Sequence, residues 1–260
     1  MVDTEFLLSV EELALAFSAL GQPQMAHDIM VAQLGNMPAD EAHVRLKTAG
    51  HSLLARGWLT LDAEARLHLA PDLERAASAL VQPVFSLRYH RSQPQGQWSA
   101  AFHFLNGAII AHRVEQGVLH HLVELHDPAA AIQQGVEFFD LARVPAFEAP
   151  LNRLSGDILT ALKDLDAAAL QEQLQAQPSL SNVARQWLSE DLLNSRFRGS
   201  ALRVVYTADH APTSERGLLL LGGPQRSWLF RFNGPDAGAP VDVLPGTASQ
   251  FAQEIRDLLS

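Results

Sequence analysis

Two stretches of the chain repeat one succession of hydrophobic and polar patterns. In the first, apolar and polar residues alternate along Phe85–His90, which places Phe85, Leu87 and Tyr89 on one face of a β-strand. Three further strand patterns and then a helical pattern follow, at residues 98–105, 108–114, 118–125 and 129–139. The stretch from Pro83 to Phe139 therefore predicts a ββββα module.

A tight hairpin is the clearest local prediction in this module. Asn106-Gly107 separates the second strand from the third, and both residues tolerate the positive φ that a two-residue turn requires. Asp127-Pro128 precedes the helix and supplies an N-cap followed by a residue preset for the first helical turn.

The second stretch, from Ser200 to Ser260, has the same order. Its strand patterns lie at residues 202–206, 216–221, 227–232 and 241–244. Thr247 then opens a closing helix, with Gln250 placed for a capping box. Tyr89 and Tyr206, the two tyrosines of the chain, fall at matching places. A duplicated unit explains this order, and two unrelated meanders are the alternative.

Helical patterns precede each module. Ser9 and Glu12 have the spacing of a capping box at the start of a first helix. A later apolar stripe has the i, i+4, i+7 and i+11 spacing of an amphipathic helix: Ala42, Leu46, Ala49 and Leu53. Two more helices and a short hairpin are expected in this half, at residues 23–34, 71–80, and 58–61 with 66–69.

Between the modules, residues 144–150 contain two prolines and little periodicity, which predicts a linker. Helices are expected at residues 155–165, 167–176 and 180–194. We therefore expect an α+β fold of two pseudo-equivalent halves, residues 1–143 and 144–260, each a helical segment followed by an antiparallel ββββα module. Together they are expected to form a central antiparallel sheet flanked by helices, in one compact pseudo-twofold unit.

The composition is that of a globular protein. Hydrophobic residues make up 47% and charged residues 18%, and no apolar run approaches the roughly 20 residues that span a bilayer. The first residues lack the basic region and cleavage site of a secretory signal, so we expect a cytoplasmic protein with no membrane insertion. The absence of cysteine excludes disulfides and thiol nucleophiles.

The charge balance argues against a nucleic-acid partner. The formal net charge is −10, whereas phosphate recognition needs a concentrated basic surface. Residues 37–72 do resemble a winged helix, but they carry four basic residues against five acidic ones. A winged-helix transcriptional regulator is therefore an alternative interpretation rather than the favoured one.

The histidines of the chain raise the alternative of a metal site. The predicted hairpin makes His103 and His112 diagonal neighbours, and His120, Glu124 and His126 share a face of the next strand. A zinc site needs three or four ligands at about 2 Å, whereas residues two apart on one strand are about 7 Å apart. Nothing in the sequence makes side chains of different strands converge, so we expect polar histidines on a half-exposed sheet, no metal and no cofactor.

Motifs of enzymatic chemistry are missing. The chain has no G-x-S-x-G, no phosphate-binding G-x-x-x-x-G-K-[ST], no H-E-x-x-H and no dinucleotide fingerprint. We therefore expect a non-enzymatic binding protein without catalytic residues, with an unrecognised hydrolase as a further alternative.

A polar strand surface in the first module is the candidate site for a protein partner. Its residues are His112, Arg113, His120 and Glu124. Polar groups of this kind can surround an apolar contact area, as at many interfaces. We expect binding here rather than on the N-terminal helices, and an ordinary solvent-exposed sheet face is the alternative.

Several short motifs resemble the EspG family, the cytosolic chaperones of ESX (type VII) secretion. They are Leu8-x-x-Glu-Glu-Leu13, the helix ending Leu53–Leu59, Pro71–Leu73 leading to Leu80–Pro83, and Val243–Gly246 followed by Phe251–Leu259. The resemblance implies a pseudo-twofold α+β protein that binds the helical tip of a secreted partner and holds it soluble, with no catalytic residues. The client and the oligomeric state stay open.

Overall fold

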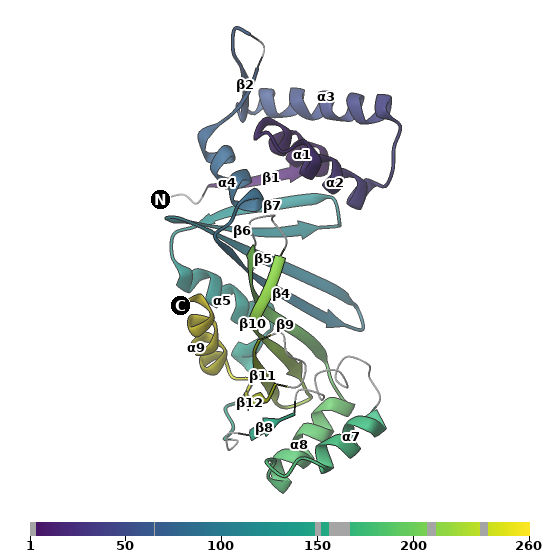
Figure 1. Cartoon of the computed structure of the whole chain (residues 1–260), viewed down its shortest axis with the longest axis vertical. Helices are drawn as coiled ribbons and strands as arrows, with labels where there is room; N and C mark the ends of the chain where they lie inside the picture. The colour runs from purple at the N-terminus through teal and green to yellow at the C-terminus, as the bar shows by residue number, and fades with distance from the viewer. Residues whose placement is uncertain (1–3, 65, 149–151, 156–166, 207–211, 235–238) are drawn as a thin grey trace. The chain divides into compact units, whose positions relative to one another are not determined.

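The computed structural model describes residues 4–64, 66–148, 152–155, 167–206, 212–234 and 239–260 (Figure 1). The chain divides into two compact units. The N-terminal unit comprises residues 1–85 and 100–128, and the C-terminal unit comprises residues 86–99 and 129–260. Each unit is described by itself.

The strands of the N-terminal unit are antiparallel neighbours in the order β1, β7, β6, β5. Their bounds are Glu5–Ser9, Leu119–Leu125, Ala108–Glu115 and Gly96–Leu105, and β5 belongs to this unit from Ala100 on. Leu105 pairs with Ala108 across the predicted Asn106-Gly107 turn, where Gly107 has a φ of 86°. The tight hairpin is therefore confirmed.

Helices cover one face of these strands. They are α1 (Val10–Ala19), α2 (Pro23–Leu34), α3 (Ala39–Ala55) and α4 (Pro71–Val81), and the hairpin of β2 (Leu59–Leu61) and β3 (Leu67–Leu69) follows α3. The sequence pattern predicts all of these elements. Alternate strand residues, such as Leu8, Ile110 and Leu122, join apolar residues of the helices in one buried core. Figure 1 shows α1 between β1 and α3.

The start of the chain, which the sequence predicts only as the cap of α1, forms strand β1. Ser9 and Glu12 make the predicted capping box: Ser9 N–H donates to the Glu12 carboxylate at 2.9 Å, and Glu12 N–H donates to Ser9 Oγ at 3.2 Å. Arg56, at the end of α3, adds an ion pair with Glu12 and donates to the carbonyl of Leu7 at 3.1 Å. This network ties β1, α1 and α3 together.

In the C-terminal unit the strands are neighbours in the order β4, β9, β10, β11, β12, β8. Their bounds are Phe85–Gln93, Phe197–Tyr206, Pro212–Gly222, Ser227–Asn233, Val241–Pro245 and Asn152–Leu154. Strand β8 is not among the predicted elements; it pairs with β12, the fourth strand of its module, just as β1 pairs with β7. Both modules thus have the predicted ββββα order, and each gains one strand from the segment before it.

The helices of the C-terminal unit complete the predicted α+β fold. They are α5 (Pro128–Phe138), the 3-10 turn Leu141–Arg143, α7 (Ala167–Gln175), α8 (Asn182–Leu193) and α9 (Ala248–Leu259). The helix expected at residues 155–165 lies almost wholly outside the described residues. Thr247 caps α9 as expected, whereas the Gln250 side chain donates to Glu254 instead of closing the capping box.

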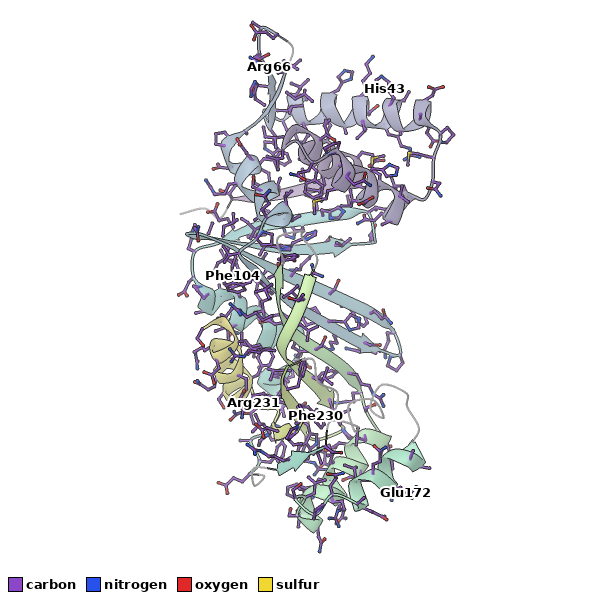
Figure 2. All side chains as sticks on the ribbon, in the orientation of Figure 1. His43, Arg66, Phe104, Glu172, Phe230 and Arg231 are labelled. Carbon is purple, nitrogen blue, oxygen red and sulfur yellow. The ribbon has the colours of Figure 1, made fainter. Side chains whose placement is uncertain are left out.

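Two apolar clusters hold this unit together. In the first, Tyr89 on β4 is buried against Phe139 and Phe251, with ring centroids 5.7 and 6.0 Å away. The second joins α7 and α8 to β10, β11 and β12 around the buried Trp228 and Phe230. Figure 2 labels Phe230 beside Arg231, its neighbour on β11. The alternation of the sequence predicts that Phe85, Leu87 and Tyr89 face the core. Leu87 and Tyr89 are buried, and Phe85 is half-buried.

Candidate functional site

A row of polar side chains crosses the helix-covered face of the N-terminal unit. His112 Nε2 on β6 lies 2.9 Å from His120 Nδ1 on β7, and His120 Nε2 lies 3.0 Å from Gln33 Oε1 on α2. The Gln33 oxygen is an acceptor, so His120 carries its proton on Nε2 and accepts from His112 through Nδ1. The row links two strands to α2.

His120 is the buried member of this row, with 1% of its surface exposed. Burial lowers the pKa of His120 to about 4, because the imidazolium would lose its hydration. His103 and His112 are the predicted diagonal neighbours, with ring centroids 5.8 Å apart. Among the described residues, no group of three or more histidine, aspartate or glutamate side chains could hold a metal ion.

The four residues expected to contact a partner do not form one surface. His112 is half-buried, and His120 lies beneath α2 through its bond to Gln33. Glu124 is on the same face and forms an ion pair with Arg75 of α4 at 2.8 Å. Arg113 is exposed and, because side chains alternate along a strand, points to the opposite face. Of the four, Arg113 is exposed, His112 and Glu124 are partly exposed, and His120 is buried.

A groove between α1, α2 and α3 is a feature that the sequence did not predict. It has a volume of about 480 Å³, and small or apolar side chains make most of its walls. The main lining residues are Ala14 of α1, Ala26, Met30 and Val31 of α2, Met37 of the connecting loop, and Ala42 and Leu46 of α3. Two histidines, His27 and His43, are the only ionisable residues among those that line it, and Figure 2 labels His43 on the N-terminal half of α3.

The groove lies where the core covers the apolar stripe of α3 only in part. The predicted stripe is present, but only Ala49 and Leu53 are buried residues of this helix. Ala42 and Leu46, from the same stripe, line the groove. The sequence contained a signal for the groove in this stripe, but nothing in its periodicity says how far along α3 the core extends.

Arginines of the winged-helix-like segment form ion pairs with carboxylates. Arg45 on α3 bonds to Glu41 and to Glu11. Arg66, at the tip of the β2–β3 hairpin in Figure 2, bonds to Asp62 and Glu64. These pairs leave little positive charge where a winged helix would meet phosphates, which agrees with the charge count.

No helix in the described part of the chain is long and apolar enough to cross a membrane.

The fold is that of an α+β protein in which helices precede antiparallel meanders, and solved structures share it, among them one that matches over nearly its full length. This is the Mycobacterium tuberculosis type VII secretion system chaperone EspG5, solved in complex with the PE25-PPE41 dimer. The TM-score is 0.66, and the match covers 98% of this chain and 96% of that chain at 12% sequence identity. At this identity the likeness concerns the fold alone, and it confirms the fold that the EspG resemblance implied.

The chain belongs to the family described as "Uncharacterised protein YfjC", whose model matches residues 5–234. A comparison with curated proteins found no match.

Proposed function

We propose that this protein is a non-enzymatic binding protein of the cytoplasm, a chaperone or adaptor that holds a helical secreted partner soluble. The observation that carries the proposal is the fold shared with a type VII secretion chaperone over 98% of this chain. The short motifs at Leu8–Leu13 and Leu53–Leu59 add support of a different kind, since their resemblance to the EspG family lies in the residues themselves and not in the fold.

Co-expression tests the function directly. The chain, with a removable tag, is purified from its native host, and proteins recovered in stoichiometric amounts are identified by mass spectrometry. Each recovered protein is then expressed alone and together with the chain. We expect a largely helical partner that precipitates alone and stays in solution as a complex. A partner that is equally soluble alone, or no stoichiometric partner, would contradict the proposal.

Within this function, the first-module surface at His112, Arg113, His120 and Glu124 is the site expected from the sequence. Arg113 is its exposed member and His112 is partly exposed, so an Arg113→Glu/His112→Ala variant tests this surface and leaves the buried His120 in place. Retention of the co-purified partner by this variant, at unchanged affinity, would exclude the surface without excluding the function. No observation favours the regulator or the hydrolase over the binding protein.

A further inference from the structure

The apolar stripe of α3 continues from the core into the groove. Ala49 and Leu53 are buried, and Ala42 and Leu46 extend the same line by two turns along the groove wall. An apolar stripe on an amphipathic helix marks the face that packs against another element. In the N-terminal half of α3, that face borders a cavity of about 480 Å³, and Leu46 contacts both the cavity and the edge of the core.

The walls of the groove suit the side chains of another helix. Small residues, Ala26 and Ala42, leave room for a backbone to come close, while Met30 and Met37 have flexible, polarisable side chains that adapt to different shapes. Helices that bind in grooves insert apolar anchors spaced at i, i+3 or i+4, and i+7. A cavity of this size lies in the usual range for a specific binding pocket, about 300–1,000 Å³.

Exposed carboxylates flank the groove. Next to its lining residues on α2 and α3 stand three acidic residues, Asp28, Asp40 and Glu41, and two basic residues, Arg45 and Lys47. Arg45 is itself bonded to Glu11 and Glu41. Asp28 and Asp40 are exposed and adjoin the lining residues His27 and Ala39. A partner that enters between these carboxylates meets a negative rim.

We propose that this groove binds an amphipathic helix of a protein partner whose apolar ridge is flanked by lysine and arginine. The apolar anchors fill the space beside Ala42 and Leu46, and the basic flanks face Asp28 and Asp40. Complementary charge of this kind directs the choice of partner and speeds association. The inference rests on the proposed function as a binding protein for helical partners. It places the site on the N-terminal helices instead of the strand surface at His112 and Arg113, and it adds the chemistry of the partner.

Two synthetic amphipathic peptides of equal length test the chemistry: a leucine–lysine peptide and its leucine–glutamate counterpart. Binding to the full chain is followed by fluorescence anisotropy. We expect the leucine–lysine peptide to bind at least about tenfold more tightly, and the preference to shrink at 1 M salt, where the screening length falls to about 3 Å. Equal affinity for the two peptides, or no binding of either, overturns the proposal.

Matched variants on α3 test the site. Ala42→Trp fills the groove, and we expect it to weaken leucine–lysine binding about tenfold or more. Val44→Trp adds the same side chain at a position that is 61% exposed and does not line the groove, so its affinity should stay within about twofold of the parent. Circular dichroism verifies that both variants fold. If the two tryptophans have equal effects, the peptide binds elsewhere and the site is wrong.

A charge reversal gives a second variant that leaves the groove open. Asp28→Lys/Asp40→Lys should reverse the preference between the two peptides. The exposed Glu74 and Glu172 provide the control, because Glu74→Lys/Glu172→Lys makes the same change in net charge outside the groove. An equal loss of leucine–lysine binding in both double variants would mean that net charge alone attracts the peptide, which overturns the site.

The native partner separates this inference from the proposed function. If a co-purified partner is kept soluble by the parent chain but not by Ala42→Trp, the proposed function and the groove site are both supported. If Ala42→Trp keeps it soluble and the Arg113→Glu/His112→Ala variant does not, the function stands and the groove is wrong.

Discussion

Trp228 and Asp191 are joined by a buried hydrogen bond: the indole Nε1–H donates to the Asp191 carboxylate at 2.8 Å. Arg226 Nε donates to the same carboxylate oxygen at 2.9 Å, and its guanidinium lies over the ring of Trp187. Asp191 has no exposed surface. One carboxylate on α8 therefore fastens this helix to β11 and to the turn before it.

Removing this carboxylate should cost the C-terminal unit much of its stability. We expect Asp191→Ala to lower the free energy of unfolding by about 3–5 kcal/mol, because Arg226 and the Trp228 indole lose a buried acceptor. Urea unfolding followed by tryptophan fluorescence measures the change. Glu190→Ala is the control: Glu190 bonds to the same Arg226 but its side chain is 55% exposed, so about 1 kcal/mol or less is expected. Equal losses in both variants would contradict this account of Asp191.

The pH dependence of stability should report His120. Its folded pKa of about 4 lies below the unfolded value of about 6.5, so in this window the unfolded chain binds a proton that the folded chain does not. Stability therefore falls as pH falls from about 6.5 to 4, by at most about 1.4 kcal/mol per pH unit from this group. We expect His120→Gln to reduce the difference in Tm between pH 7 and pH 5.

His51→Gln serves as the control for that measurement, since His51 is an exposed residue of α3. It should leave the difference in Tm unchanged. A parent-like pH dependence in His120→Gln would show that the imidazole does not stay neutral in the folded state.

Close packing of α5 on β4 gives a further prediction. A Cβ added to Gly135 would lie 2.7 Å from ring atoms of Tyr89, which is buried. We expect Gly135→Ala to destabilise the fold by about 1–3 kcal/mol, although alanine is the better helix former. Gln133→Ala, on the exposed side of the same helix, should change stability by no more than about 0.5 kcal/mol. Thermal unfolding distinguishes the two, and a stabilised Gly135→Ala would mean that Tyr89 gives way.

Arg56 and Arg45 form a matched pair for testing the network at β1. Arg56→Ala leaves Glu12, whose side chain is 10% exposed, without its cation, so we expect a loss of about 2–4 kcal/mol. Arg45→Ala removes an exposed guanidinium and should cost about 1 kcal/mol or less. Urea midpoints of the two variants provide the comparison. Similar midpoints would contradict a special role for Arg56.

The elements that the sequence predicts correctly are those whose pattern is local. The Asn106-Gly107 turn and the Ser9–Glu12 capping box depend on neighbouring residues, and both form as expected. Strand β8 depends on pairing with β12, far along the chain, and its three residues have no alternating pattern of their own. Arg56 reaches Glu12 across a separation of 44 residues, which no periodicity encodes.

The candidate site is harder to predict for the same reason. Alternation on either side of the Asn106-Gly107 turn correctly places His103 and His112 on one face as diagonal neighbours. It cannot show that Gln33 of α2 covers His120, since helix placement over a strand is a tertiary property. The groove depends likewise on where the core stops beneath α3. Periodicity identifies an apolar face but does not say what lies against it.

The network at β1 limits how other chains can join this unit. The carbonyl of Thr4 accepts a hydrogen bond from the N–H of Glu124, next to β7. Backbone groups alternate in direction along a strand, so those of Leu7 and Ser9 point away from β7, toward the free edge of β1. A strand added to this sheet would pair at that edge. At this edge the Arg56 guanidinium already donates a hydrogen bond to the carbonyl of Leu7, and the N–H of Ser9 donates to the Glu12 carboxylate. An extended segment would have to displace both side chains before β-augmentation could begin. These two side chains therefore hinder edge-to-edge pairing with another strand at β1.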